Sequence, residues 1–182
     1  MSKRILLNSE EINIILNRLS CQLIENHDNF KETVLIGIQP RGVFLSERLK
    51  QLLIKNYHLD KINFGKLDIT FFRDDFMRGD KVLKANKTDI NFVVEDKKVV
   101  FIDDVLYTGR SIRSALTAIQ SFGRPKSIEL LTLIDRRFSR HLPIQPDYKG
   151  RQVDAINRER VIVSWAENNG EDAVYLIQDN NE

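Results

Sequence analysis

The sequence of 182 residues contains one cysteine, one tryptophan and three histidines, and it has no long apolar run. A single cysteine cannot form an intramolecular disulfide, and zinc sites built on cysteine need more thiolates than the chain contains. The apolar runs are far shorter than the roughly 20 residues that a membrane-spanning helix needs. The charged first residues are not followed by the apolar segment of a secretory signal. We therefore expect a cytoplasmic protein that does not enter a membrane.

An excess of charge of one sign is also missing. The chain has 28 lysine and arginine residues against 26 aspartate and glutamate residues, a formal net charge of +2. So small a net charge does not by itself predict binding to nucleic acid. The length, and a hydrophobic content of 42%, are typical of a globular domain with a sizeable core. We expect residues 1–182 to form a single domain.

The first half of the chain shows a helix, a strand and a second helix. Apolar residues at helical spacing follow Ser9, which is a favourable N-cap, and we expect this helix to end before a surface loop at His27 and Asp28. The branched apolar run 33–38 predicts a buried strand. A turn at Gln39–Gly42 then leads into the second helix, as in the first half of a βαβ unit.

The second strand–turn–helix unit gives a clearer signal. We expect a strand at 99–102, a turn at 103–110, a helix with its apolar face at 112–119, and a further strand at 127–134. Strands that alternate with helices predict an α/β fold with a doubly wound, mostly parallel sheet. In such sheets ligands bind outside the carboxyl ends of the strands. Polar clusters follow three predicted strands at such ends, namely residues 39–42, 103–111 and 135–137.

The remaining segments leave two alternatives open. Residues 61–73 predict one strand, or two short strands broken at Gly65. Residues 74–91 are polar and long for a plain connection, which indicates either a functional lid or a solvated hairpin tip. The last part, 141–182, has two short apolar runs and predicts a small C-terminal layer appended to the sheet.

The strand at 99–102 delivers two adjacent carboxylates, Asp103 and Asp104, to the edge of the predicted sheet. Neighbouring carboxylates repel, so they favour a partner with hydrogen-bond donors or positive charge, such as a ribose diol with a magnesium ion nearby. We expect both side chains to meet solvent or ligand rather than the core. The alternative is a purely structural role, in which the two residues form an acidic turn that caps an ordinary helix.

The segment Tyr107–Ser111 runs into the start of a helix, where backbone N–H groups and the helix dipole favour a phosphate. Thr108 and Ser111 add hydroxyl donors, and Gly109 allows a close approach of the backbone. The segment has no Gly-Lys-Ser or Gly-Lys-Thr end, so it is not a Walker A loop, and it is not a dinucleotide-binding glycine motif.

This stretch, VVFIDDVLYTGRS, resembles the motif with which type I phosphoribosyltransferases bind 5-phosphoribosyl 1-pyrophosphate (PRPP). Its form DDVLYTGRS is similar to that of the PyrR family of pyrimidine operon regulators and uracil phosphoribosyltransferases. The resemblance covers most of the chain. It continues in order through Ile36–Leu49, Leu67–Asp75, Gly123–Arg136 and Leu142–Arg151.

The resemblance implies a role for each candidate residue. Asp103 and Asp104 accept hydrogen bonds from the ribose hydroxyls. Arg73 belongs to a mobile segment that closes over the reaction. The 5-phosphate is bound by Val105, Leu106, Tyr107, Thr108, Gly109, Arg110 and Ser111; Pro40 and Arg41 belong to the pyrophosphate loop; and Asp135, Arg136 and Val161 border the base. The family also implies Mg²⁺ held mainly through PRPP rather than by protein ligands, and a homodimer or a higher homo-oligomer.

The function implied is the formation of UMP and pyrophosphate from uracil and PRPP. Two alternatives share the same ligand site: a regulator that binds a leader RNA, and a PRPP or nucleotide sensor with little catalysis. The chain departs from the family pattern at 137–141 and 154–156, on the base side. It also has Asn17 and Cys21 where threonine and histidine often occur on the RNA-binding helix.

Overall fold

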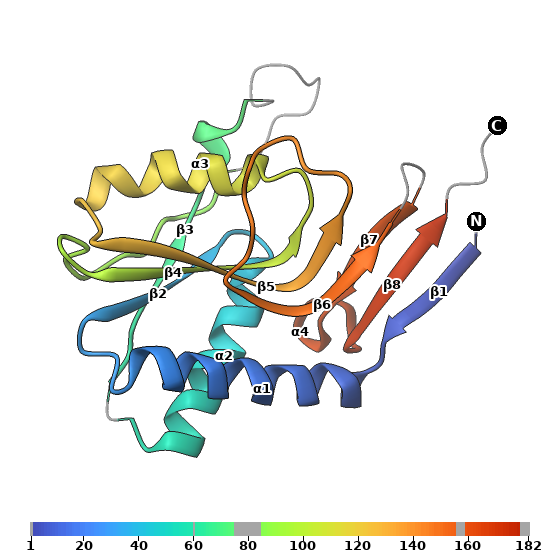
Figure 1. Ribbon diagram of the computed structural model, residues 1–182, viewed down its shortest axis with the longest axis horizontal. Coiled ribbons are helices and arrows are strands. Elements are labelled where there is room, and N and C mark those ends of the chain that lie inside the picture. The colour runs from blue at the N-terminus through green and yellow to red at the C-terminus, as the bar shows by residue number, and fades with distance from the viewer. Residues whose placement is uncertain (1, 60, 75–84, 156–158, 179–182) are drawn as a thin grey trace.

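A computed structural model describes residues 2–59, 61–74, 85–155 and 159–178 (Figure 1). The main sheet is parallel and consists of β2 (Thr33–Ile38), β3 (Asn63–Leu67), β4 (Lys98–Leu106), β5 (Ser127–Arg137) and β6 (Tyr148–Asp154). Its strand order is β3-β2-β4-β5-β6. The predicted doubly wound parallel sheet is thus confirmed.

A smaller antiparallel sheet lies beside the main one, with the strand order β1-β8-β7 (Figure 1). Its strands are β1 (Ser2–Leu7), β7 (Glu159–Ser164) and β8 (Ala173–Gln178). The C-terminal layer predicted for residues 141–182 is present in β7 and β8, but β6, from the same range, belongs to the main sheet. The layer also takes in β1 from the other end of the chain, which we did not predict.

The longer helices cover the two faces of the main sheet. They are α1 (Ser9–His27), α2 (Gly42–Tyr57) and α3 (Arg110–Ile119), and short turns of helix occur at η1 (Thr70–Phe72), η2 (Gln120–Phe122) and α4 (Ala166–Asn169). Figure 1 shows α1 and α2 on one face and α3 on the other. No helix in the described ranges has the length and apolar character needed to span a membrane.

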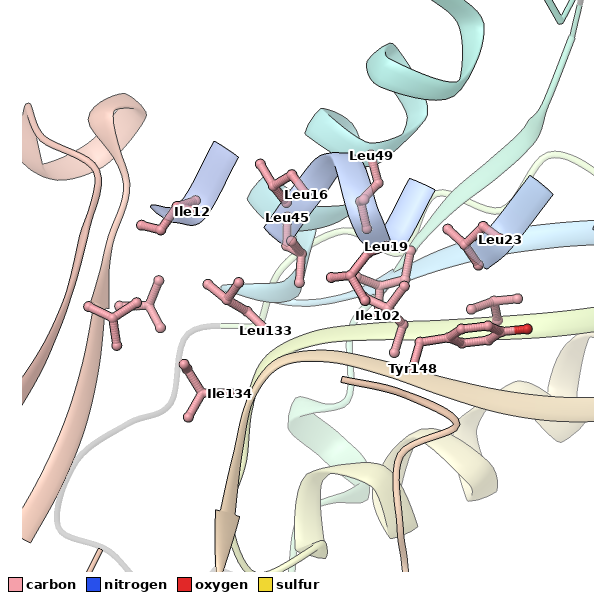
Figure 2. Close-up of a cluster of buried hydrophobic side chains, with 14 of the residues drawn as sticks. Ile12, Leu16, Leu19, Leu23, Leu45, Leu49, Ile102, Leu133, Ile134 and Tyr148 are labelled. Carbon is pink, nitrogen blue, oxygen red and sulfur yellow. The ribbon is translucent and has the colours of Figure 1, made fainter. Parts of the chain in front are cut away.

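The core has two parts because successive strand residues point to opposite faces of a sheet. On β4, Val100 and Ile102 belong to the cluster under α1 and α2, whereas Val99 and Phe101 belong to the cluster under α3. Figure 2 shows the first cluster, in which side chains of α1 and α2 gather over the sheet, including Leu16, Leu19, Leu45, Leu49, Ile102 and Leu133.

Helix α1 begins and ends differently from the prediction. The N-cap is Asn8 rather than Ser9, because the Asn8 side chain accepts a hydrogen bond from the Glu11 amide at 2.9 Å and the Glu11 side chain accepts one from the Asn8 amide. His27, predicted in a surface loop, is the last helical residue and is buried. Its ring lies 3.1 Å from the hydroxyls of both Tyr148 and Thr33, and these contacts hold it inside.

The structure decides between the two alternatives for β3, and it lengthens two predicted strands. β3 runs through Gly65 as one strand, so the alternative of two short strands is wrong. β4 and β5 extend four and three residues beyond their predicted ends, to Leu106 and Arg137, and the backbone pairing between them continues through Leu106 and Asp135. The acidic pair and Asp135 therefore belong to strands rather than to turns.

The strand order creates a switch point between β2 and β4. From β2 the chain passes through α2 to β3 on one side, and from β4 it passes through α3 to β5 on the other side. Connections that diverge from adjacent parallel strands leave a crevice at the carboxyl ends of those strands, and ligands bind there in such folds. Arg41 lies in the segment after β2, and the acidic pair lies near the carboxyl end of β4.

Candidate functional site

The acidic pair lies at the carboxyl end of β4. Asp103 is half-buried in a cavity wall, and its Oδ1 accepts the Asp104 amide at 2.9 Å. Asp104 is 5% exposed, so it is shielded from solvent, and the expectation that it meets a ligand stays a prediction. Its Oδ2 atom is buried without a hydrogen-bond partner among the described residues.

The charges around the pair explain its electrostatics. Burial raises the pKa of both carboxyls, and repulsion by Asp104 raises that of Asp103 further. Arg41 opposes both shifts, since its Nη1 lies 4.0 Å from Asp104 Oδ2. A ligand that donates hydrogen bonds to these oxygens, or brings a cation to them, would relieve the cost of burial.

The segment after β4 forms one wall of a cavity of about 220 Å³ at the start of α3. Tyr107–Ser111 and Asp103 line it together with Arg73 from the η1 end, so the structure brings these predicted residues together. Helix α3 leaves its first N–H groups without intrahelical partners, and they border this cavity. The volume lies below the roughly 300–1,000 Å³ of drug-sized sites, and it suits a compact anion such as phosphate.

Gly109 shapes this cavity. It precedes α3 with φ 90°, a left-handed conformation that side chains disfavour. A Cβ atom at this position would lie 3.3 Å from Ile144 Cδ1 and 3.5 Å from Leu142 Cβ. Glycine is thus favoured mainly by the backbone angle, and a Cβ atom would require only a small shift of the Ile144 side chain.

The Arg110 side chain is engaged by Asp74 at the cavity mouth. Arg110 Nε donates to the Asp74 carboxylate at 2.9 and 3.1 Å, and the Arg110 and Arg113 Nη2 groups donate to it as well. These contacts, with Arg110 as the larger cause and Arg113 as the smaller, lower the pKa of Asp74 to about 2. A carboxylate of the protein thus sits beside the predicted phosphate-binding groups. The predicted mobile segment continues into residues 75–84, which lie outside the described residues.

The segment after β2 lines a second cavity, of about 570 Å³. Pro40 and Arg41 are on its wall, as predicted for a pyrophosphate loop, and Lys66 and Lys87 join them. The loop packs directly on β4, because a Cβ atom at Gly42 would lie only 2.2 Å from the Ile102 carbonyl oxygen. This close packing places the Arg41 guanidinium beside Asp104 and links the second cavity to the acidic pair.

On the base side, Arg136 is buried and stacks on Tyr107, with its guanidinium carbon 3.9 Å from the ring centroid. Its Nη2 donates to the Glu159 carbonyl at 2.9 Å, and its Nε is buried without a partner among the described residues. Burial lowers the pKa of Arg136. Val161 lies two residues further along β7 and is half-buried.

Asp135, also predicted on the base side, is occupied by protein partners. Its carboxylate accepts hydrogen bonds from Arg140 and, at 3.3 Å, from the Gln152 amide. Asp135 lines a third cavity, of about 650 Å³, formed with residues 137–146. Its side chain therefore acts first as an anchor for that segment.

The segment 138–144 contacts the phosphate-binding loop, which we did not predict. Arg140 donates to the Tyr107 carbonyl, and the His141 amide donates to the Thr108 carbonyl at 3.0 Å. Arg140 and His141 fall within the stretch 137–141, which departs from the family pattern. No local pattern in the sequence signals these contacts, since they depend on how the segment folds back over β4.

Lys66 and Lys87 were also missed. Lys66 lies on β3, and its place beside Arg41 follows from the parallel pairing of β3 with β2. Among the described residues, no group of three or more histidine, cysteine, aspartate or glutamate side chains is arranged to hold a metal ion.

Comparison with known proteins assigns the chain to a family. The family model "Phosphoribosyl transferase domain" matches residues 3–167. The fold and the site thus define a phosphoribosyltransferase, which confirms the predicted class of pentosyltransferase.

Full-length relatives show to which family of phosphoribosyltransferases the chain belongs. Proteins named "Bifunctional protein PyrR" match over nearly their whole length: that of Desulfosudis oleivorans is 42% identical over 177 residues, with 97% of each chain covered. The relative from Elusimicrobium minutum is 39% identical with 99% of each chain covered, and that from Synechocystis sp. is 42% identical with 95% and 96% covered. The chain belongs to the PyrR family.

Solved structures agree on the fold. A hypoxanthine phosphoribosyltransferase from Staphylococcus aureus has a TM-score of 0.70 at 22% identity, with 97% of this chain and 93% of that chain covered. A hypoxanthine-guanine phosphoribosyltransferase from Bacillus anthracis has a TM-score of 0.69 at 17% identity, with 98% and 100% covered. At this identity the likeness concerns the fold alone.

Proposed function

We propose that the protein transfers the 5-phosphoribosyl group of PRPP to uracil, forming UMP and pyrophosphate. The observation that carries this proposal is the acidic pair at the β2/β4 switch point, with one cavity at the start of α3 and another at Arg41. The cavity at the start of α3 suits the 5-phosphate. The cavity at Arg41 suits the pyrophosphate. The buried Asp104 oxygen beside Arg41, which has no hydrogen-bond partner among the described residues, suits a ribose hydroxyl.

In the reaction, the bond between the anomeric carbon and the pyrophosphate oxygen breaks and a bond from that carbon to N1 of uracil forms. Pyrophosphate leaves with the bonding electron pair, and the N1 proton of uracil goes to solvent or to the leaving pyrophosphate. The anomeric carbon becomes oxocarbenium-like. The nearby Asp103 and Asp104 carboxylates stabilise this positive charge, and Arg41 stabilises the negative charge on the leaving group.

Magnesium belongs to the same proposal. Mg²⁺ commonly binds through one or two carboxylates together with substrate phosphates, and the Asp104 oxygen that lacks a hydrogen bond among the described residues fits that description. Asp103 and Asp104 would be the protein groups nearest to such an ion, which would neutralise pyrophosphate oxygens when bound with PRPP.

The base side supports recognition of a nucleobase. The buried Nε of Arg136 is a hydrogen-bond donor without a partner among the described residues, and a base carbonyl oxygen would satisfy it. The Tyr107 ring keeps the Arg136 guanidinium in place. Val161 and Asp135 remain proposed base-side residues, and Asp135 acts through the segment that it anchors.

A second function, binding of a leader RNA, is favoured by one feature of the surface. Arg18 Nη2 donates to the carbonyls of Lys149 and Gly150 at 3.1 and 2.6 Å, and Arg151 Nη1 donates to the Leu6 carbonyl at 2.6 Å. Backbone carbonyls orient a guanidinium without neutralising its charge, so these groups still attract phosphates. The word "Bifunctional" in the names of the relatives agrees with a second role.

The release of pyrophosphate from PRPP in the presence of Mg²⁺, measured with and without uracil, tests the proposed enzymatic activity. If PRPP binds but no base promotes release, the protein is a sensor or a regulator. Salt-dependent binding to a pyrimidine-operon leader, absent with an unrelated RNA of the same length, would support the RNA-binding function.

A further inference from the structure

We propose that Lys66 and Lys87 bind the pyrophosphate leaving group together with Arg41. This inference rests on the proposed function, because it extends the site at the pyrophosphate loop by two cations from other parts of the chain. Neither lysine belongs to the acidic pair, to the phosphate-binding loop or to the loop after β2.

The charge of the second cavity is the first support. Its wall includes three cationic side chains, from Arg41, Lys66 and Lys87. The other lining residues carry no charge; they are Gln39, Pro40, Val43, Phe44, Asn86 and Asn168. A wall of cations and amides without a carboxylate suits a small and highly charged anion. Pyrophosphate is such an anion, and the reaction releases it beside Arg41.

Hydrogen bonds of the backbone around the two lysines are the second observation in favour of this inference, because they fix the positions of Lys66 and Lys87 at the cavity. The Lys66 amide donates to the Asp89 carbonyl at 2.9 Å, and the Asp89 amide donates to the Lys66 carbonyl at 2.8 Å. The Gln39 side-chain amide donates to the Lys87 carbonyl at 2.9 Å. The segment 85–89 is thereby tied both to β3 and to the residue that precedes Pro40.

A buried carboxylate, that of Asp68, also anchors the segment 85–89 to the end of β3. Asp68 is buried, and its Oδ1 accepts the Thr70 hydroxyl at 2.7 Å while its Oδ2 accepts the Asn86 amide at 3.3 Å. The Asp68 amide in turn donates to Thr88 Oγ1 at 3.1 Å. Lys87 lies between Asn86 and Thr88, so both of its neighbours are anchored to the end of β3.

The structural alternative is that Lys66 serves only as the partner of Glu47, whose Oε1 lies 2.5 Å from Lys66 Nζ. Glu47 is on α2 and is not among the residues that line the cavity. Lys66 lines the cavity although its ammonium pairs with Glu47, and Lys87 and Arg41 add two further positive charges to the lining. The two interpretations differ in whether pyrophosphate affinity depends on Lys66.

Calorimetry with Mg²⁺–pyrophosphate and with ribose 5-phosphate as separate ligands distinguishes them. The double variant Lys66→Gln and Lys87→Gln removes both charges and keeps side chains of similar length. We expect it to bind pyrophosphate about 10- to 100-fold more weakly, the effect of losing one to two charge-assisted hydrogen bonds. Its affinity for ribose 5-phosphate should stay within about twofold of the wild type.

Two further variants complete the design. Lys66→Arg with Lys87→Arg keeps both charges and should retain most of the pyrophosphate affinity. Lys126→Gln makes the same charge change at an exposed residue next to the amino end of β5, far from the cavity, and should change neither affinity.

Unchanged pyrophosphate affinity in the double glutamine variant would overturn the inference, and so would an equal loss for both ligands, which indicates a general change of structure or charge. A wild-type protein that binds neither ligand would instead refute the proposed function itself. The two failures are therefore distinguishable.

Discussion

Some single residues of the site are buried at a cost in electrostatic free energy, and Asp104 is the clearest case. Its carboxylate is buried, and one oxygen has no hydrogen-bond partner among the described residues. Such an arrangement costs free energy in the ligand-free protein and becomes favourable when a ligand supplies donors. Strain of this kind is typical of a binding site rather than of a core.

Changing Asp103→Asn together with Asp104→Asn tests this assignment. The variant keeps the side-chain shape and removes both negative charges, so UMP formation should fall by about 100-fold or more, as when preorganised charge is lost from other active sites. A steady-state assay measures this, and near-normal turnover would remove the pair from the site.

In the same variant, we also expect the free energy of unfolding to depend on pH differently from that of the wild type. Burial raises the pKa of both carboxyls, so the folded protein binds more protons than the unfolded chain. The stability contributed by the protonated form is fully present below the unfolded pKa of about 3.9 and is lost as pH rises through the folded pKa. The asparagine variant lacks this loss. Its advantage in urea midpoint over the wild type should therefore grow from pH 4 to pH 7.

At the level of elements, the start of α3 is built around Gly109. Changing Gly109→Ala should cost about 1–2 kcal/mol of stability through the left-handed backbone angle. It should also weaken ribose 5-phosphate binding by about tenfold, because the strained backbone and the contact with Ile144 displace the loop that lines the cavity.

Gly170 offers a matched control for this substitution. It has φ 77°, and a Cβ atom there would have no neighbour within 4 Å. Gly170→Ala should therefore lose a similar amount of stability in thermal unfolding and leave phosphate binding unchanged. Equal ligand affinities in the two alanine variants would show that Gly109 has only a conformational role.

The end of α1 is tied to the amino ends of three strands by a buried polar network. His27 Nε2 lies 3.1 Å from both Tyr148 Oη and Glu129 Oε2, and Nδ1 lies 3.1 Å from Thr33 Oγ1. Burial lowers the pKa of His27; Glu129 opposes this shift and Lys98 adds to it. The network lies at the end of the sheet opposite to the proposed active site.

The lowered pKa predicts that acid weakens this network. Between the folded pKa and the unfolded value of about 6.5, the unfolded chain binds more protons than the folded protein, so stability falls as pH decreases. The urea midpoint of the wild type should drop from pH 7.5 to pH 5.5, and His27→Gln should reduce that drop. His141→Gln, at an exposed histidine, is the control; an identical drop in both variants would contradict the role of His27.

At the scale of the whole molecule, the sequence predicts elements that depend on local pattern and misses those that depend on pairing between distant segments. The strand Thr33–Ile38 was predicted with its observed ends, because every one of its residues is buried and apolar runs mark such strands. β6 was missed because it is an edge strand on which five of seven residues are at least partly exposed, so it has no apolar run. β1, the other missed strand, lies at the edge of the small sheet and has the charged residues Lys3 and Arg4 in its first half.

The site shows the same division. The acidic pair and the loop to Ser111 were predicted because their chemistry is contiguous in the sequence. Lys66, Lys87 and Arg140 reach the site only through the pairing of β3 with β2 and through the return of the segment after β5. The burial of His27 likewise needs Glu129 and Tyr148, which lie more than one hundred residues further along the chain.

PRPP chemistry at the β2/β4 switch point is the central claim, and UMP formation tests it most directly. Wild-type protein is incubated with PRPP, Mg²⁺ and either uracil, orotate, hypoxanthine or guanine, and the nucleotide product is separated and identified. We expect UMP from uracil, with the other bases used poorly or not at all. No nucleotide from any base, despite measurable PRPP binding, would contradict the enzyme and leave a regulator or sensor built on the same site.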